Sequence, residues 1–333
     1  MNGVEFRKIC IVGAGAIGGW IGVHLARAGA QLCVLARGDT LSALQKNGLQ
    51  LHQGGLLHST PVKASNDAAA LGVQDLVVIS VKAPALATVA QQIGPLLGPD
   101  TVVLTAMNGV PWWFLQGFGG PVQGQALASV DPQGAIARAI PAAHIVGCVV
   151  HASCSVDAPG VIRHHFGDGL IVGEPSGENS ARVQALHALL QKAGFNATLS
   201  PQIQKDIWYK LWGNMTVNPI SAITGATSDR LLDDDLVRGF MSNVMLEARA
   251  IGERIGIPIT QAPEDRHAVT RKLGAFKTSM LQDVQAGRPV ELDALVSAVR
   301  ELGQLTGVVT PFTDALLGLS RLHARGLGLY PRQ

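Results

Sequence analysis

The N-terminal segment constrains the fold more than any other part of the chain. Lys8–Val12 is a short apolar, β-branched run that predicts a buried strand ending at Gly13. Residues 17–28 predict a helix that Gly29 would end, and Gln31–Leu35 predicts a second strand. A strand, a helix and a strand in such quick succession indicate a parallel β-α-β unit.

The pattern of predicted elements divides the 333 residues into two parts. Strand-like runs continue through the first part, at residues 76–81, 102–104, 145–151 and 170–172. Long helical patterns replace them after about residue 200, at residues 235–254, at 272–286 and from 290 past 299. We therefore predict an α/β fold: a Rossmann-type, doubly wound, mostly parallel sheet over residues 1–200, followed by an all-α domain over residues 201–333.

A glycine fingerprint of the form G-x-G-x-x-G lies between the first predicted strand and helix. With 39 glycines in 333 residues, about 0.5 such matches are expected by chance, so its position carries the argument. There, Gly13 allows a tight turn, Gly15 lets a pyrophosphate approach the backbone, and Gly18 lets the helix pack on its strand. The residues predicted to bind a dinucleotide are Gly13, Ala14, Gly15, Ala16, Ile17 and Gly18.

The end of the second predicted strand indicates which dinucleotide is bound. Sites for NAD place Asp or Glu there, to hold the ribose 2′-hydroxyl. This chain has Arg37 instead, and a guanidinium binds a 2′-phosphate through forked, charge-assisted hydrogen bonds. Asp39, two residues later, leaves NAD open, but Arg37 favours NADPH/NADP as the cofactor.

Composition excludes several other classes of function. The formal charge is +2 and no long basic run occurs, so we expect no nucleic-acid partner. The apolar stretch that follows Lys8 is short and broken by glycines, so we expect neither a membrane span nor a signal peptide. The four cysteines lack paired spacing, which indicates reduced thiols and a cytoplasmic protein.

Three polar residues in the second part, Lys210, Asn214 and Asn218, recur every four positions. On an α-helix this spacing places all three on one face. One interpretation is a solvated polar stripe. The other is a cationic acid beside two amides that orient a carbonyl substrate, and the spacing alone does not decide between them.

A later segment carries a more specific pattern. Ser279-Met280-Leu281-Gln282-Asp283 is followed by Gly287-Arg288-Pro289-Val290-Glu291-Leu292-Asp293, in which Pro289 suits the first turn of a helix and Glu291 its N-terminus. Together with the fingerprint, Val81-Lys82, Asn108-Gly109 and the Lys210 to Asn218-Pro219 motif, this string resembles the ketopantoate reductase (2-dehydropantoate 2-reductase) family. The resemblance covers nearly the whole chain.

The resemblance implies NADPH-dependent reduction of a 2-oxo acid, ketopantoate, to pantoate, toward pantothenate and coenzyme A. It implies that Lys210 is the proton donor, that Asn214, Asn218 and Ser279 bind substrate, and that Asn108 lies near both substrate and nicotinamide. It further implies that Lys82 and Ala152 line the cofactor side and that Glu291 touches the cofactor or orders the site. No metal is implied, and a homodimer is possible.

Two other functions are compatible with parts of the sequence. One is a β-hydroxyacid dehydrogenase of the 6-phosphogluconate dehydrogenase type, against which the string from Ser279 to Asp293 argues. The other is a non-catalytic NADPH-binding sensor, against which Lys210 argues.

Three features depart from the family pattern. Pro111-Trp112-Trp113-Phe114 replaces a polar stretch, and we interpret its aromatics as a hydrophobic anchor rather than a reshaped substrate site. Ser228 stands where some relatives have Asn. His164 and His165, as neighbours on a strand, would face opposite ways and not share a metal.

Overall fold

The computed structural model describes residues 4–117 and 119–332, and these form two compact units. The first unit contains the chain up to Met107 and Gly134–Ile203; the second contains Asn108–Gln133 and the chain from Gln204 onward. The predicted division at 200/201 is therefore incomplete, because Asn108–Gln133 belongs with the helices.

Buried side chains explain why this segment joins the second unit. Trp112, Trp113 and Phe114 are at most 5% exposed, and the ring of Phe114 lies 6.0 Å from that of Trp208. The Glu301 carboxylate also accepts hydrogen bonds from two backbone N–H groups of the segment. These aromatics form a hydrophobic anchor, as the sequence interpretation held.

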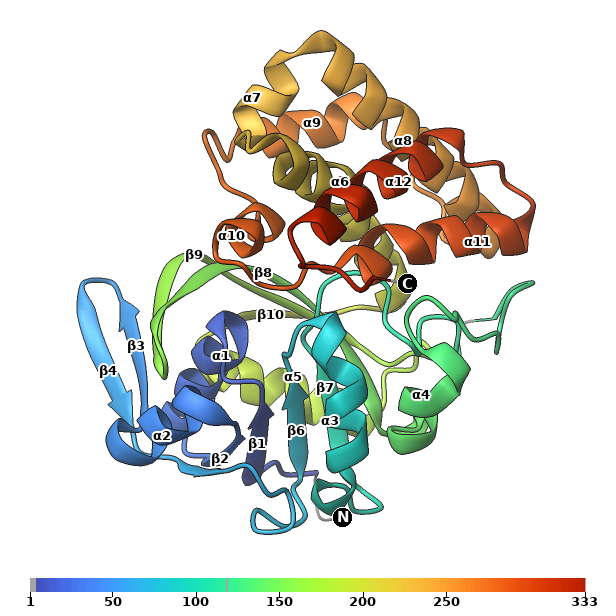
Figure 1. Ribbon diagram of the computed structural model, residues 1–333. Coiled ribbons are helices and arrows are strands. Elements are labelled where there is room, and N and C mark those ends of the chain that lie inside the picture. The colour runs from blue at the N-terminus through green and yellow to red at the C-terminus, as the bar shows by residue number, and fades with distance from the viewer. Residues whose placement is uncertain (1–3, 118, 333) are drawn as a thin grey trace. The chain divides into compact units, whose positions relative to one another are not determined.

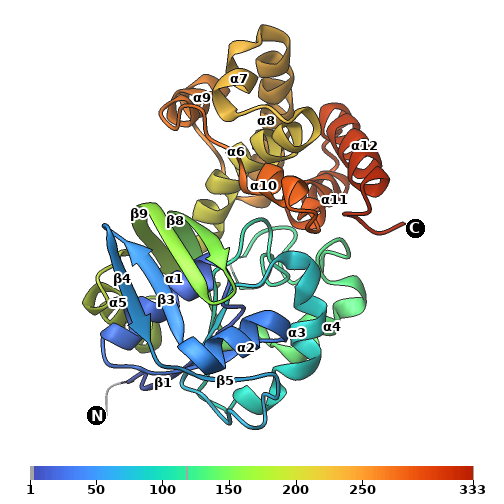
Figure 2. The ribbon, with the colours of Figure 1, turned by 60° about the vertical axis from the view of Figure 1, so that its left-hand side comes forward.

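The described residues of the first unit form one ten-stranded sheet in the order β4-β3-β9-β8-β7-β6-β1-β2-β5, with β10 beside β9 (Figures 1 and 2). Only the β3–β4 and β8–β9 pairs are antiparallel. The strands are β1 (Lys8–Val12), β2 (Gln31–Leu35), β3 (Leu49–Gln53), β4 (Leu56–Thr60), β5 (Lys63–Ser65), β6 (Leu76–Ile79), β7 (Val102–Thr105), β8 (Ile145–Ala158), β9 (Val161–Gly173) and β10 (Asn196–Leu199).

Helices of the first unit connect and cover these strands. They are α1 (Ala16–Arg27), α2 (Gly38–Asn47), α3 (Leu86–Gln92), α4 (Ala135–Ala139) and α5 (Ala181–Lys192). Short 3₁₀ turns occur at Ala83–Ala85, Gly94–Leu96, Pro132–Gly134 and Ala142–His144. The mostly parallel α/β fold predicted from sequence is confirmed.

The three glycines of helix α1 lie among its buried residues, where close packing explains them. A Cβ at Gly19 would lie 2.6 Å from Ile162 of β9, and one at Gly22 would lie 3.1 Å from Ile11 of β1 and from Leu49 of β3. The curled sheet therefore closes around α1 tightly enough to require glycine on its surface. This packing fixes the N-terminus of α1, where the glycine fingerprint lies.

The helices of the second unit lie in the chain from Ile203 onward (Figure 1), whereas the described residues of its segment Asn108–Gln133 form mainly turns and loops. These helices are α6 (Ile203–Thr224), α7 (Ser228–Asp233), α8 (Asp235–Ile255), α9 (Pro263–Arg271), α10 (Ser279–Gln285), α11 (Ala298–Thr306) and α12 (Pro311–Gly326). The first residue of α6, Ile203, is the last residue of the first unit. A π-helical turn, Asp293–Ser297, leads directly into α11. None of the helices in the described ranges is long and apolar enough to cross a membrane.

Two predicted helices of this unit differ from the structure. The helix predicted over 272–286 is only α10, because Gly274 has a left-handed backbone and the Thr278 side chain caps the N-terminus at Ser279. Pro289 lies ahead of the next helix rather than in its first turn, because that helix begins after Glu291 with the π-helical turn.

Candidate active site

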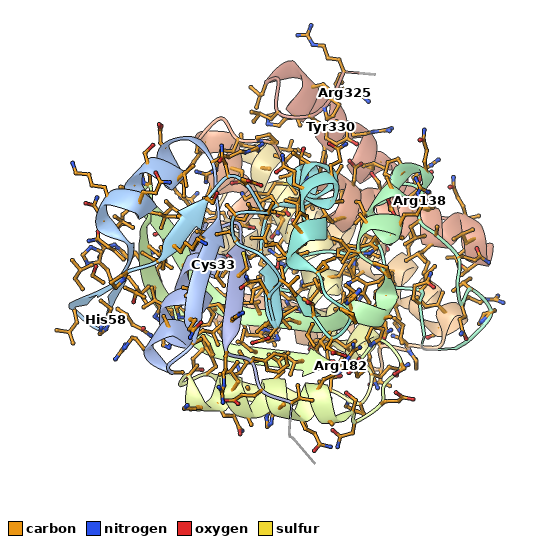
Figure 3. All side chains as sticks on the ribbon, turned by 90° about the horizontal axis from the view of Figure 1, so that it is seen from below. Cys33, His58, Arg138, Arg182, Arg325 and Tyr330 are labelled. Atoms are coloured by element: carbon orange, nitrogen blue, oxygen red, sulfur yellow. The ribbon has the colours of Figure 1, made fainter. Side chains whose placement is uncertain are left out.

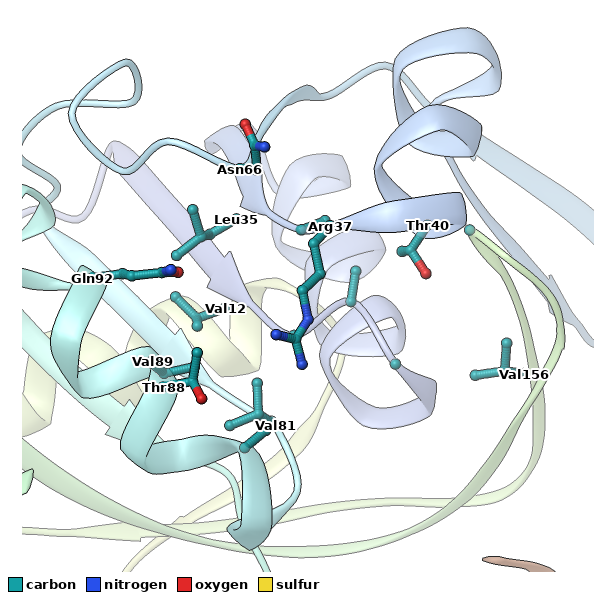
Figure 4. Close-up of a pocket in the computed structure, with 16 residues that line it drawn as sticks. Val12, Leu35, Arg37, Thr40, Asn66, Val81, Thr88, Val89, Gln92 and Val156 are labelled. Carbon is teal, nitrogen blue, oxygen red and sulfur yellow. The ribbon is translucent and has the colours of Figure 1, made fainter. Parts of the chain in front are cut away.

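A cavity of about 470 Å³ opens at the carboxyl ends of β1, β2 and β6 (Figure 4). The chain runs from β1 to β2 on one side and resumes with β6 on the other, which makes this the switch point where open α/β sheets bind ligands. Its wall consists of Val12, Gly13, Ala14, Gly15, Leu35, Ala36, Arg37, Thr40, Asn66, Val81, Ala85, Thr88, Val89, Gln92, Val156 and Gly160.

The three fingerprint glycines have three different physical reasons. Gly13 has φ +93°, and a Cβ there would lie 2.6 Å from the Val81 side chain. A Cβ at Gly18 would collide with the Ser80 hydroxyl and the Gly13 carbonyl. At Gly15, by contrast, no other part of the described chain lies within 4 Å of that position. The space beside Gly15 is open to a ligand, at the N-terminus of α1.

This end of α1 suits a phosphate. Gly15 caps the helix without a side-chain hydrogen bond, and no acidic residue occurs in the first turn. The backbone N–H groups and the helix dipole therefore favour an anion here. The geometry fits the pyrophosphate of a dinucleotide, as the fingerprint predicted.

Arg37 extends its guanidinium into the middle of the cavity (Figure 4). Thr40 and Asn66 line the same end of the wall, whereas Asp39 is exposed in the first turn of α2 and lies outside it. The sequence analysis did not identify Thr40 or Asn66 as residues of this site. Thr40 could have been found from its position one helical turn after Arg37, but Asn66 follows a three-residue strand that carries too little pattern to predict.

Several residues predicted on the cofactor side do not line this cavity. Ala16, Ile17 and Gly18 form the first turn of α1 behind its wall, and Lys82 directly follows the wall residue Val81. Ala152 lies on β8, four residues before the wall residue Val156. Glu291 belongs to the second unit and is 8% exposed.

Lys210 and Asn108 come together within the second unit. The Lys210 ammonium donates a 2.8 Å hydrogen bond to Oδ1 of Asn108, which precedes it by 102 residues. Asn214 and Asn218 follow Lys210 on α6, where Asn214 is half-buried and Asn218 is 6% exposed. The polar stripe is therefore not simply a solvated helix face, and a polar site accounts for it better.

The Ser279–Asp293 string lies in the same unit and consists of α10, the loop after it and the first residue of the π-helical turn. Ser279 is the exposed first residue of α10, and the buried Asp283 carboxylate accepts a 3.0 Å hydrogen bond from Arg288. Glu291 lies two residues before the start of the π-helical turn. The predicted roles of Ser279 and Glu291 stay predictions.

The remaining departures from the family pattern have structural partners. The Ser228 hydroxyl donates to the Gly274 carbonyl at 2.9 Å, so it ties α7 to the loop before α10. His164 stacks on Trp20, and His165 hydrogen-bonds the Ser155 hydroxyl at 2.9 Å. In residues 4–117 and 119–332, no group of three or more His, Cys, Asp or Glu residues could hold a metal ion.

The open space beside Gly15 predicts that Gly15→Ala separates folding from ligand binding. The added methyl group meets no other part of the protein but enters the volume of a bound dinucleotide. We expect an unchanged Tm and at least about tenfold weaker NADPH binding by fluorescence titration. Gly18→Ala is the matched comparison, and its collision with Ser80 and Gly13 should lower the Tm. Unchanged NADPH affinity in Gly15→Ala would contradict the placement of the pyrophosphate.

Two protein-family models together match most of the chain. The family model for ketopantoate reductase PanE/ApbA matches residues 9–177, and that for the ketopantoate reductase PanE/ApbA C-terminal region matches residues 202–324. A protein of Mesorhizobium japonicum named 2-dehydropantoate 2-reductase is 48% identical over 324 residues, which cover 97% of this chain and 99% of that protein.

Solved structures share the complete fold. A structure from Ralstonia solanacearum MolK2 has a TM-score of 0.95 at 58% identity and covers 98% of this chain and 100% of that one. A D-mandelate dehydrogenase with NADH and anilino(oxo)acetate has a TM-score of 0.84 at 21% identity, covering 97% of this chain and 100% of that one, and shows the fold alone. The matches over both units show that the chain belongs to the ketopantoate reductase family of oxidoreductases.

Proposed function

We propose that this protein reduces ketopantoate to pantoate with NADPH, and that Lys210 supplies the proton. The observation that carries the proposal is the 2.8 Å hydrogen bond between the Lys210 ammonium and Asn108. It holds a cationic acid at a defined place on the helix that also presents Asn214 and Asn218. The relative from M. japonicum, which is named 2-dehydropantoate 2-reductase, supports the choice of substrate.

The chemistry follows from the charge that develops on the substrate. A bound reduced nicotinamide supplies a hydride for the keto carbon of a 2-oxo acid. As the π bond of the carbonyl group is lost, negative charge grows on its oxygen, and the Lys210 ammonium stabilises this charge. The ammonium then transfers a proton to that oxygen, which leaves a 2-hydroxy acid. Asn108 holds one of the three ammonium N–H donors, which restricts the orientation of the amine before the substrate arrives.

Asn214 and Asn218 are proposed to bind the polar groups of the substrate. A carboxamide both donates and accepts hydrogen bonds, so it can hold a hydroxyl as well as a carbonyl or carboxylate. Their spacing of one helical turn presents them in a row with Lys210. Ser279 is proposed as a further substrate ligand.

The first unit supports NADPH rather than NADH. The Arg37 guanidinium lies in the cavity, while the competing Asp39 carboxylate is exposed and outside its wall. A guanidinium stabilises a 2′-phosphate, whereas a carboxylate at this position would repel it. Thr40 and Asn66 are proposed as additional hydrogen-bonding partners of the same end of the cofactor.

Two finer points complete the proposal. None of the four cysteines, all of which lie in the described residues, forms a disulfide, and Cys10, Cys33 and Cys148 are buried, which supports a reducing compartment such as the cytoplasm. A homodimer stays a prediction.

The substrate assignment predicts that ketopantoate has the highest kcat/KM in a panel of 2-oxo acids. The loss of absorbance of the reduced nicotinamide follows NADPH oxidation. It measures kcat/KM for ketopantoate beside pyruvate, phenylglyoxylate and branched 2-oxo acids. A strong preference for another acid would assign a different reductase. Tight NADPH binding without turnover on any acid would instead identify a sensor.

The role of Lys210 predicts that Lys210→Ala lowers kcat by at least about a hundredfold, the usual scale for a general acid. Lys205→Ala, on the exposed side of the same helix, is the matched control and should retain wild-type turnover. The NADPH Kd should be similar in both variants. Normal turnover of Lys210→Ala would remove Lys210 from the mechanism.

Arg37→Asp should reverse the cofactor preference. We expect the KM for NADPH to rise at least about tenfold, because the variant loses the phosphate partner and gains a repelling charge. The KM for NADH should change far less. Lys46→Asp makes the same charge change at the other end of α2 and should affect neither cofactor. An equal rise for both cofactors would refute the contact with the 2′-phosphate.

A further inference from the structure

The π-helical turn Asp293–Ser297 contacts both the loop that holds Lys210 and residues near the C-terminal end of the described chain. In this turn the Ala298 N–H donates to the Asp293 carbonyl, five residues back, instead of to the residue four back. Such turns widen the helix by an extra residue and recur at functional sites. The contacts on both sides of the turn show what this one does.

The backbone of the turn contacts the loop that carries Asn108. The Ala294 carbonyl accepts a 2.8 Å hydrogen bond from the Val110 N–H. Gly109 has φ +82°, and a Cβ there would lie 2.6 Å from the same carbonyl oxygen. The loop therefore packs backbone to backbone on the π-helical turn, and the next residue, Asn108, accepts the hydrogen bond from Lys210.

The side chain of Asp293, at the start of the turn, contacts the C-terminal tail. The Tyr330 hydroxyl donates a 2.6 Å hydrogen bond to Oδ1 of Asp293, which also accepts one from Ser297 at 3.0 Å. The Arg325 guanidinium lies 5.6 Å from the centre of the Tyr330 ring (Figure 3). The Val290 N–H donates to the Leu329 carbonyl at 3.1 Å. The tail is thus tied once to the turn, at Asp293, and once to the segment just before it, at Val290.

Tyr330 is suited to remain a donor. Burial and the neighbouring Asp293 carboxylate raise the pKa of Tyr330 to about 12. The phenol therefore keeps its proton at the pH of any ordinary assay, and the hydrogen bond to Asp293 persists.

We propose that Asp293 and Tyr330 are positioning residues that act through the π-helical turn and the Asn108 loop on the Lys210 ammonium. The inference rests on the proposed role of Lys210 as proton donor. Loss of the tail contact would free the turn and let Asn108 shift, and an error of about 1 Å in a catalytic group can cost about a hundredfold in rate. Neither residue touches the substrate in this proposal.

The test is Tyr330→Phe, which removes one hydroxyl and keeps the ring beneath Arg325. We expect kcat with ketopantoate and NADPH to fall about tenfold, with less than about a twofold change in either KM. The NADPH Kd and the Tm should stay at wild-type values. Tyr209→Phe is the matched control, because the Tyr209 ring packs beside Arg266 outside this chain of contacts, and its turnover should not change.

Two further variants distinguish positioning from a general structural role. Asp293→Asn keeps an oxygen that accepts a hydrogen bond from Tyr330 and should retain a near wild-type kcat. Asp293→Ala loses this acceptor and should lower kcat as Tyr330→Phe does. In a Lys210→Ala background, Tyr330→Phe should cause no additional loss, because the group that it positions is absent.

The outcomes separate this inference from the proposed function. Wild-type kcat in Tyr330→Phe would overturn the inference, as would an equal loss in the Lys210→Ala background together with a lower Tm. Full activity of Lys210→Ala would instead overturn the proposed role of Lys210 itself.

Discussion

The hydrogen bond between Lys210 and Asn108 is the interaction on which the candidate chemistry depends. It joins a residue in the middle of α6 to a loop that precedes it by 102 residues. An amine on a long flexible side chain loses considerable conformational entropy when it is held in one place, so a fixed partner matters for catalysis. The rest of the second unit can be understood by how it holds these two groups.

Helix α6 contributes rigidity to this arrangement. Its apolar side is buried through residues such as Trp208, Leu211 and Trp212, and the Trp212 indole donates to the Met245 carbonyl of α8 at 2.7 Å. The Asn108 loop has no helical periodicity of its own. It is ordered by buried aromatics, by Glu301 and by the Ala294 carbonyl, which all belong to the same unit. The proposed proton donor, on a rigid helix, is thus oriented by a loop that tertiary contacts hold.

The first unit has a different proposed task, which is to bring backbone close to a large anion. The curled sheet encloses α1, and glycine at positions 18, 19 and 22 permits that close packing. The helix N-terminus is therefore fixed at the switch point of the sheet, and Gly15 leaves open the space that a pyrophosphate needs. Arg37 adds charge at the end of the neighbouring strand.

Local patterns in the sequence were sufficient to predict the elements β1, α1 and β2. They also sufficed to place the glycine fingerprint and Arg37 at the ends of these elements, and Lys210, Asn214 and Asn218 on one helix. Each of these depends on near neighbours in the chain: apolar periodicity, a glycine at a turn, or side chains one helical turn apart. The tertiary structure alone decided that Asn108–Gln133 joins the helical unit and that Asp293 begins a π-helical turn. It also decided that Asn66 lines the cavity and that Tyr330 reaches Asp293. These features depend on hydrogen bonds and packing between residues far apart in the chain, and no local pattern encodes such pairings.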